Sequence, residues 1–393
     1  MAYEAPDFYD VDSLLTEEER VVRDTVRGWV EERVMPDIGR HFEDGTFPEH
    51  TIREMGEMGL LGASIEGYGC AGMNDTAYGV ICRELERGDS GIRSFASVQG
   101  SLVMWPIFAY GSEEQRMKWL PRMAKGEVIG CFGLTEPDFG SDPGGMITNA
   151  RKVDGGYVLN GAKMWITNGT ISQVAIVWAK LRDPGSGKDV IRGFIVETNT
   201  KGFSAPEQKR KHSLRASVTS ELILQDVFVP EDGLLPNVQG LKGPLGCLSQ
   251  ARYGIAFGVV GAAMACFHAA AEYSKSRIMF GKPIGSYQMI QSELADMLTE
   301  ITKAQLLCVQ LGRIKERGSV KPEQISLAKR NNCEIALDIA RRARDILGAN
   351  GITAEYPIMR HMCNLESVKT YEGTHNIHTL VLGEAVTGIA AYR

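Results

Sequence analysis

The sequence lacks the patterns that identify the commonest metal and nucleotide sites. Its eight cysteines are scattered, with no C-x-x-C pair and no spacing typical of metal ligands. No G-x-G-x-x-G follows a predicted strand, and neither a Walker pattern nor H-E-x-x-H is present. His375 and His378 lie three residues apart on a predicted helix, but no third ligand is near them in the sequence. We therefore expect reduced, mostly buried thiols, no metal and no doubly wound nucleotide-binding fold.

An excess of basic charge is also missing. The chain has 43 Lys and Arg against 49 Asp and Glu, for a formal net charge of −6, which disfavours nucleic-acid binding. The first residues have neither the basic and apolar regions of a signal peptide nor the arginines of a transit peptide, so we expect a cytoplasmic or organelle-matrix location. The most apolar run, 254–271, is rich in glycine and alanine, which favours packing inside a protein over a membrane span.

What is present is a long series of helical patterns with one interruption. The 393 residues indicate two or three packed units. Thr16 followed by Glu19 predicts a capping box at the start of a first helix. Further helical patterns cover 48–59, 74–88 and 112–125, so we predict a helical N-terminal domain over 1–130.

The helical patterns give way to strand-like patterns after residue 130 and return after residue 242. Short β-branched and aromatic runs separated by Gly-Gly, Asn-Gly and Asp-Pro-Gly turns predict an antiparallel sheet or small barrel over 131–242. Helical patterns at 250–278, 286–317, 322–348 and 374–391 then predict a helical bundle over 243–393. The expected class is α+β, mainly α, with a segregated sheet.

A break between helical patterns near the C-terminus carries the first candidate for chemistry. Glu372 is followed at once by Gly373 and Thr374, and a helical pattern then resumes. A glycine frees the backbone and lets another molecule approach closely, so we take Glu372 as a candidate general base. Most glutamates beside a glycine are surface residues, and the assignment depends on the rest of the sequence.

Four further segments have compositions that an ordinary globular protein does not readily produce. The first combines glycines with hydroxyl side chains, which form a concave nest suited to an anion or a planar ring. The second places an aromatic and a hydroxyl on one face of a predicted strand. In the third a long helix is predicted to end at Gly281 and Pro283, and the fourth is a helix stop with two glycines. These segments are Cys131–Asp142, Trp165–Asn168, Arg277–Pro283 and Asp345–Gly351.

Together with Tyr371–Thr374, these segments resemble the acyl-CoA dehydrogenase family of flavoenzymes over nearly the whole chain. The resemblance implies a helical N-terminal domain, a middle β-domain, a C-terminal four-helix bundle, a non-covalently bound FAD and a homo-oligomer, usually a tetramer. Within the family it is strongest to the glutaryl-CoA dehydrogenases, through Ser90–Ser94, Ser97–Gln99, Ser213–Ser217 and Arg252–Ala256.

The resemblance implies residues for both ligands. Those expected to bind FAD, some of them in a neighbouring subunit, are Phe132, Leu134, Thr135, Gly140, Ser141, Trp165, Ile166, Thr167, Arg277, Phe280, Gln288, Asp345, Ile346, Gly348, Ala349, Thr374, His375 and Asn376. Those expected to bind the acyl-CoA substrate are Glu86, Arg93, Ser94, Ser141, Leu245, Arg252, Tyr371, Gly373 and Tyr392.

The implied reaction converts glutaryl-CoA to crotonyl-CoA and CO2. Glu372 would remove a Cα proton, a hydride would pass from Cβ to FAD, and the electrons would pass on to an electron-transfer flavoprotein. Arg93, in a predicted helix loop, matches the cation that binds the terminal carboxylate, and Glu86 and Tyr371 match the polar pair associated with decarboxylation.

The sequence departs from the family pattern at four positions. In the FAD motifs, Phe139 stands where a small residue is usual and Ala349 where a glycine or serine is usual. At the acyl end, Ile92 stands where a tyrosine is common and Phe95 is bulkier than usual. Because of Ile92 and Phe95, a second hypothesis stays open, that the protein is a dehydrogenase or oxidase for another short-chain acyl-CoA. A third reading, a catalytically silent scaffold protein, is disfavoured because Glu372 and the FAD motifs are retained.

Overall fold

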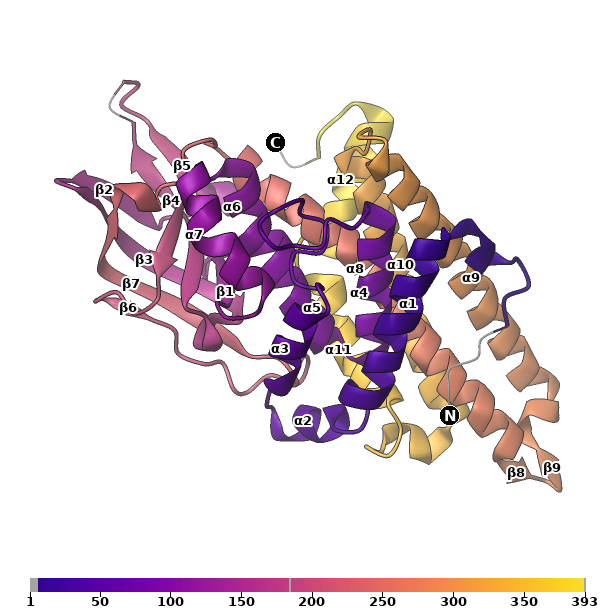
Figure 1. Ribbon diagram of the computed structural model, residues 1–393. Helices are drawn as coiled ribbons and strands as arrows, with labels where there is room; N and C mark the ends of the chain where they lie inside the picture. The colour runs from indigo at the N-terminus through magenta and orange to yellow at the C-terminus, as the bar shows by residue number, and fades with distance from the viewer. Residues whose placement is uncertain (1–5, 184, 392–393) are drawn as a thin grey trace.

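The computed structural model describes residues 6–183 and 185–391, and its first part is helical (Figure 1). Thr16 Oγ1 accepts a hydrogen bond from Glu19 N at 3.3 Å while the Glu19 carboxylate accepts one from Thr16 N at 2.8 Å, which confirms the predicted capping box. The helices here are α1 (Glu17–Trp29), α2 (Ile38–Asp44), α3 (His50–Glu57), α4 (Asp75–Gly88), α5 (Ser90–Ser97), α6 (Trp105–Tyr110) and α7 (Glu113–Ala124), with π-helical turns at Val30–Val34 and Val98–Met104.

The prediction of a loop around Arg93 is wrong. Arg93 lies inside α5, which the Asp89 carboxylate begins by accepting a hydrogen bond from Gly91 N at 2.6 Å. Every residue from Ser90 through the π-helical turn to Met104 is buried, so the polar side chains that recur at helical spacing in α5, Ser90, Arg93, Ser94 and Ser97, are inside the protein and not in a surface loop.

A seven-stranded sheet follows, with strand order β1-β4-β2-β3-β7-β6 and β5 paired to β4. Most pairings are antiparallel, but β4 pairs in parallel with both β1 and β2, a mixture that the turn signals did not predict. The strands are β1 (Gly130–Gly133), β2 (Asn149–Val153), β3 (Gly156–Thr167), β4 (Val174–Arg182), β5 (Asp189–Glu197), β6 (Phe203–Ser204) and β7 (Thr219–Pro230).

The rest of the chain is helical except for one hairpin. Helix α8 ends at Ser276, so the predicted end at Gly281 and Pro283 is wrong. A β8–β9 hairpin follows instead, with Phe280 (φ 51°) and Gly281 (φ 81°) at its turn, the pair of positive φ angles that a tight hairpin requires. The elements are α8 (Lys242–Ser276), β8 (Ile278–Met279), β9 (Lys282–Pro283), α9 (Gln288–Glu316), α10 (Pro322–Ile346), α11 (Ile358–Thr370) and α12 (His375–Thr387).

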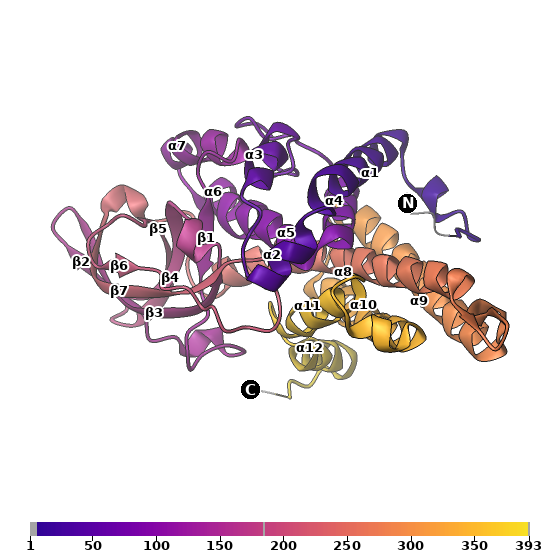
Figure 2. The same cartoon turned by 90° about the horizontal axis from the view of Figure 1, so that it is seen from below.

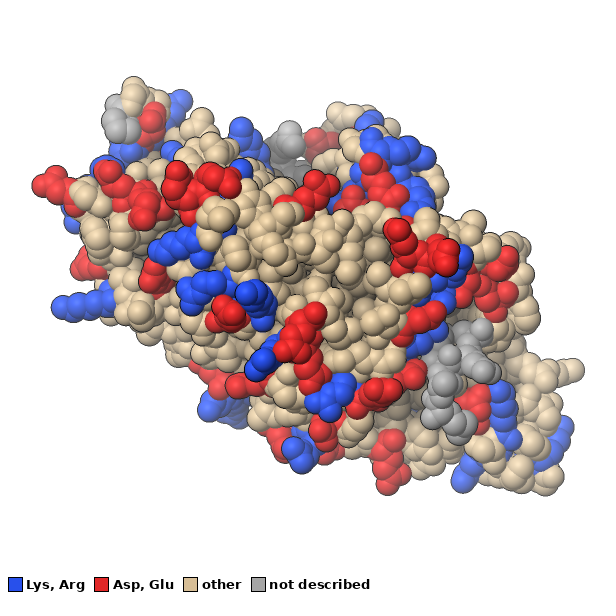
Figure 3. All heavy atoms as spheres, viewed as in Figure 1, with Lys and Arg blue, Asp and Glu red and all other residues tan. Residues whose placement is uncertain are grey.

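Helix α8 is the centre of the fold. By length and composition it is the one described helix that could cross a membrane, but 78% of its most apolar window is buried inside the protein. Helices of the N-terminal part lie on one side of it and α10–α12 on the other (Figure 2). The sheet lies at one end of the molecule and the β8–β9 hairpin at the opposite end (Figure 1). The face in Figure 3 carries acidic and basic side chains interspersed.

The fold is the one that the resemblance implied, a mainly helical chain with a middle β-domain. The first strand begins at Gly130 and α8 begins at Lys242. The domain limits 1–130, 131–242 and 243–393 stay predictions.

Candidate active site

Glu372 lies in the turn between α11 and α12. Its φ of 52° and the φ of 87° at Gly373 place two successive residues in the left-handed region, which turns the chain sharply between the helices. Thr374 Oγ1 then accepts a hydrogen bond from Ile377 N at 3.2 Å and begins α12. Oε2 of Glu372 is buried without a hydrogen-bond partner among the described residues. A buried oxygen of this kind is costly unless a ligand or solvent engages it, which marks a functional position.

The surroundings of Glu372 shift its acidity. Burial raises the pKa of the carboxyl above its ordinary value, and the positive charges of Arg93, Lys329 and Arg252 oppose that shift without cancelling it. A carboxylate with a raised pKa is a stronger base, so Glu372 is suited to accept a proton.

Three partly buried hydrogen bonds fix the backbone at and on both sides of Glu372. Arg252 Nε on α8 donates to Glu372 O at 2.7 Å. Lys329 Nζ on α10 donates to Tyr371 O at 2.5 Å and to Gly373 O at 2.7 Å. The sequence analysis missed Lys329. Its signal was a lysine in the apolar stripe of a helical pattern, between Ile325 and Ala336, where a buried cation needs a specific partner.

The predicted acyl-end residues meet beside this turn. Arg93 Nε donates to Glu86 Oε2 at 2.6 Å, and Arg93 Nη2 donates to the Tyr371 hydroxyl. Ser94 Oγ lies 3.3 Å from the same hydroxyl, and Ser90 Oγ donates to Glu86 Oε1 at 2.8 Å. Arg93 is only 1% exposed and Glu86 is fully buried, so this is an internal charge pair and not a surface one. The structure thus brings Glu86, Arg93, Ser94 and Tyr371 together next to Glu372.

On the sheet, β3 presents an exposed aromatic face. Trp165 has a φ of 64° and its side chain is 65% exposed, at a register shift between Lys163 and Ile166 in the β3–β7 pairing. Thr167 follows two residues later, on the same face of the strand. Phe132, Leu134 and Ile166 are buried beneath, and Met164 N donates to Thr135 O at 2.9 Å. An exposed indole beside hydroxyls is suited to stack on a planar ring.

A buried ion pair supports the loop after β1. Lys163 Nζ lies 2.8 Å from Glu136 Oε1 and also donates to Leu134 O at 3.1 Å, while the Glu136 carboxylate accepts from Ile147 N and Thr148 N at 2.7 and 3.0 Å. These bonds tie both ends of the loop that holds Gly140 and Ser141 to β3. This pair was not predicted from the sequence, because Lys163 lies on β3 and Glu136 lies in the loop after β1, 27 positions away.

Two of the residues expected to bind substrate, Leu245 and Arg252, lie on α8. Leu245 is 38% exposed near the start of α8, and Arg252 lies seven residues further along the same helix face. This face leads from the open start of α8 to the Glu372 turn. Tyr392 lies outside the described residues.

Seven of the predicted FAD residues lie at the other end of the molecule. The segments that hold Arg277 and Ala349 are neighbours, since Asn350 Nδ2 donates to the Tyr273 hydroxyl at 3.1 Å. Phe280 is 92% exposed on the hairpin. One chain therefore does not bring this group to Trp165 (Figure 1). The group comprises Arg277, Phe280, Gln288, Asp345, Ile346, Gly348 and Ala349.

The start of α12 contributes polar groups of a different kind. His375 Nδ1 lies 3.5 Å from Glu334 Oε2, and Asn376 is exposed. His378 is buried with Nδ1 3.0 Å from Ser326 Oγ, and burial lowers its pKa to about 3, which keeps it neutral. Among the described residues no group of three His, Cys, Asp or Glu is placed to hold a metal ion.

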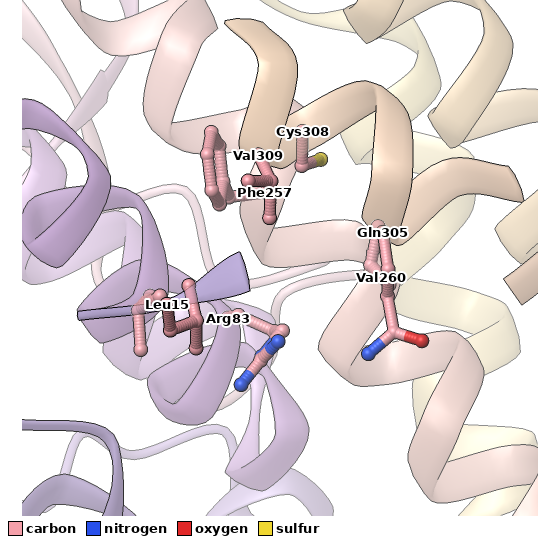
Figure 4. Close-up of a pocket in the computed structure, with 8 residues that line it drawn as sticks. Leu15, Arg83, Phe257, Val260, Gln305, Cys308 and Val309 are labelled. Carbon is pink, nitrogen blue, oxygen red and sulfur yellow. The ribbon is translucent and has the colours of Figure 1, made fainter. Parts of the chain in front are cut away.

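Two cavities lie away from Glu372. Figure 4 shows one of about 10 Å³, enough for a single water, between Leu15, Arg83, Phe257 and α9. A groove of about 580 Å³ runs between α7 and the ends of β5 and β7, lined by Lys118, Glu197 and Phe228 among others. Neither contains a predicted site residue.

Comparison with known proteins agrees with the fold and site. Family models for acyl-CoA dehydrogenases match in three parts, the N-terminal domain over residues 16–127, the middle domain over 131–227 and the C-terminal domain over 239–387. An acyl-CoA dehydrogenase of Bacillus subtilis (strain 168) is 35% identical over 376 residues, which cover 95% of this chain and 99% of that protein.

Solved structures give the same answer. The chain is similar to a glutaryl-CoA dehydrogenase from Mycobacterium smegmatis in complex with FADH2, with 53% identity, a TM-score of 0.95 and 98% of each chain covered. It is also similar to butyryl-CoA dehydrogenase from Megasphaera elsdenii, with 33% identity, a TM-score of 0.90 and coverage of 97% of this chain and 100% of that one. The chain belongs to the acyl-CoA dehydrogenase family.

Proposed function

We propose that this chain is an FAD-dependent glutaryl-CoA dehydrogenase that also decarboxylates its product. The observation that carries the substrate assignment is the buried Arg93 beside Tyr371 and Glu372. Two of the guanidinium nitrogens bind Glu86 and Tyr371, and among the described residues Nη1 has no hydrogen-bond partner. A guanidinium with a free donor is suited to bind a second carboxylate, such as the one at the far end of a glutaryl chain.

The residues present fit FAD as the cofactor. The exposed indole of Trp165 beside Thr167 offers a stacking face, and the loop from Leu134 to Ser141 offers backbone N–H groups and hydroxyls. FAD, when bound, supplies the acceptor for the hydride that leaves Cβ of the acyl chain. The similar glutaryl-CoA dehydrogenase structure in complex with FADH2 supports the same assignment.

Glu372 then acts as the general base. Its buried Oε2 takes the proton from Cα of the thioester while the hydride leaves Cβ, so the acyl chain loses two hydrogens and gains a double bond. Burial against the acyl chain excludes water and keeps the pKa of the carboxyl raised. General-base catalysis of this kind contributes about 10²–10⁴-fold.

The positions of Arg93 and Tyr371 support a second step, decarboxylation. When the C–C bond to the terminal carboxylate breaks, CO2 leaves and the electron pair stays on the conjugated acyl chain. A proton added at Cγ then gives crotonyl-CoA, and the protonated Glu372 is a donor for it. Arg93 holds the carboxylate before the bond breaks. Glu86 balances part of the guanidinium charge, which weakens the attraction that would otherwise oppose loss of the carboxylate's negative charge as CO2 forms.

Two partners complete the proposal. The seven predicted FAD residues that include Arg277 and Ala349 lie far from the strand that carries Trp165 within one chain. This separation supports a homo-oligomer in which a neighbouring subunit completes each FAD site. Family resemblance suggests a tetramer. An electron-transfer flavoprotein is proposed as the acceptor by family resemblance.

The test is anaerobic mixing of the purified protein with glutaryl-CoA and, separately, with butyryl-CoA. Flavin absorbance and the mass of the acyl products are followed. Bleaching by glutaryl-CoA with formation of crotonyl-CoA and CO2 is expected. Bleaching by butyryl-CoA alone would replace this proposal with a short-chain acyl-CoA dehydrogenase. The observation that favours that second candidate is Glu86, because it already neutralises Arg93.

A further inference from the structure

Lys329 occupies an unusual position for a lysine. It lies in the middle of α10, is 1% exposed and is surrounded by apolar and small side chains of the same helix face. Among the described residues no carboxylate lies within ion-pair distance of its ammonium. Buried lysines without such a partner are rare because desolvation of the charge is costly, so this one needs an explanation.

The partners of Lys329 are backbone carbonyls. Nζ donates to Tyr371 O at 2.5 Å and to Gly373 O at 2.7 Å, the carbonyls directly before and after Glu372. Arg252 donates to the carbonyl between them, that of Glu372 itself, at 2.7 Å. Three successive carbonyls therefore accept hydrogen bonds from two buried cations that come from different helices.

This arrangement lies at the most constrained turn of the site. Glu372 and Gly373 both have positive φ, and a residue with a side chain rarely adopts that conformation unless its surroundings impose it. The last helical bond of α11 runs from Tyr371 N to Ser367 O at 2.9 Å, and the first of α12 runs from His378 N to Thr374 O at 3.1 Å, so Glu372 and Gly373 lie between the two helices. The two hydrogen bonds from Lys329 Nζ connect the residues on either side of Glu372.

We propose that Lys329 is a positioning residue for the general base. By binding the carbonyls on both sides of Glu372, it holds the left-handed turn and aims the Glu372 carboxylate into the acyl site. The role of the turn in catalysis rests on the proposed function, but the hold of Lys329 on the turn does not.

A second effect follows from charge. The Lys329 ammonium is one of the cations that oppose the raised pKa of Glu372, so its loss would raise the pKa of that carboxyl further. Burial lowers the pKa of Lys329 itself to about 8, so it is charged at neutral pH. Nζ also lies 5.9 Å from the centre of the Tyr371 ring. The titratable and charged groups that face it are Arg93 on α5, Arg252 on α8, Cys333 on α10, Tyr371 and Glu372 in the turn, and His375 and His378 on α12.

The test uses two substitutions in the FAD-loaded oligomer, with a control. Lys329→Met removes both the charge and the donors at similar length. Lys329→Gln removes the charge but keeps an N–H donor. The control is Lys303→Met on α9, a lysine that is 62% exposed and paired only with Glu300 on its own helix. FAD absorbance shows that each variant is folded and loaded.

The first measurement needs no turnover. Hydrogen–deuterium exchange of the segment 367–380 in substrate-free protein is expected to rise at least about tenfold in Lys329→Met, less in Lys329→Gln and not at all in the control. Equal exchange in all four proteins would overturn the positioning role, whatever reaction the protein catalyses. If Lys329→Met fails to load FAD, the Lys329→Gln variant carries the test.

The second measurement is the pH profile of flavin reduction by acyl-CoA. Both Lys329 variants are expected to need a higher pH for half-maximal rate, and Lys329→Met to lose about 10–100-fold in kcat with little change in KM, because a misplaced base affects the chemical step. A lower rate with an unshifted profile would reduce Lys329 to a structural residue. Failure of the wild type to reduce its flavin with any acyl-CoA would contradict the proposed function and leave the exchange result standing.

Discussion

Arg93 and Tyr371 lie 278 positions apart in the sequence and are joined by a hydrogen bond from Nη2 to the phenol oxygen. This contact ties the buried helix α5 to the turn that carries Glu372, so the residues expected at the far end of the acyl chain and the expected base belong to one hydrogen-bonded unit. The ring of Tyr371 also lies 5.8 Å from the guanidinium carbon of Arg93. A change at either end of this unit therefore affects the other.

The first prediction concerns Glu372→Gln. The amide has nearly the shape of the carboxylate but cannot accept the Cα proton, so we expect FAD to stay bound and the bleaching of the flavin by substrate to fall by about 10²–10⁴-fold. Stopped-flow absorbance under anaerobic conditions measures this. The control is Glu366→Gln on α11, an exposed carboxylate paired with Arg341, which should bleach normally. Normal bleaching by Glu372→Gln would rule out the base assignment.

The second prediction concerns the pH dependence of the same step. Glu372 must be ionised to act as a base, and its pKa is raised above the ordinary 4.5 by burial. The bleaching rate should therefore decline as pH falls through this raised pKa, at a pH above 4.5. Single-turnover rates from pH 4.5 to 8.5 measure the midpoint. A midpoint at or below the ordinary value would show that the carboxyl is not desolvated in the working enzyme.

The third prediction concerns Arg93→Ala. Loss of the cation should impair kcat/KM for glutaryl-CoA at least about 100-fold more than for butyryl-CoA, because only the first has a terminal carboxylate to pair. The single variant leaves Glu86 buried without its partner, which costs roughly 3–5 kcal/mol of stability. The double variant Glu86→Gln with Arg93→Ala removes that penalty and keeps the comparison interpretable. Equal losses on both substrates in the double variant would assign Arg93 a structural role only.

The fourth prediction concerns stability and uses Glu84, a buried carboxylate of α4 to which no role in the reaction is assigned. Burial alone would raise the pKa of this carboxyl, but Arg83, Arg27 and Arg87 surround it and lower it from 4.5 to about 2. A lowered folded-state pKa means that the stabilisation is fully present above pH 4.5 and is lost as pH falls towards 2. Glu84→Gln should lower the free energy of unfolding at pH 7 by about 3–5 kcal/mol in urea titrations. Little difference from wild type at pH 7 would contradict the network.

The parts of this structure that sequence analysis predicted are those with local causes. Thr16 and Glu19 bind each other across one helical turn, so their spacing alone reveals the helix start. Turn pairs and β-branched runs likewise reveal strands, but not which strands pair in parallel, because pairing is decided between segments distant in sequence. The β8–β9 hairpin was missed because it has only two residues on each side of its turn.

In the site, too, the residues with local sequence patterns were predicted and those defined by distant partners were not. Glu372 was predicted because a carboxylate beside a glycine at a helix break is a local pattern. Lys329 was not, because its partners are carbonyls 42 and 44 positions away, and nothing near it in the sequence marks them. The residues of α5 were assigned through family resemblance alone. Their polar side chains recur at helical spacing, but burial of a polar helix face depends on partners distant in sequence, such as Tyr371 for Arg93.

The last prediction concerns the two groups of proposed FAD residues that one chain keeps apart. If Trp165 of one subunit and Arg277 of another form one site, then Trp165→Ala and Arg277→Ala should each lower the affinity of the homo-oligomer for FAD. Mixed oligomers of the two variants, made by co-expression with different tags and purified on both, then contain some sites with both substitutions and some with neither. We expect part of the FAD affinity and of the substrate bleaching to return in the mixture. Activity no higher than that of either parent would mean that each site is built within one chain, and that the exposed Phe280 hairpin serves another purpose.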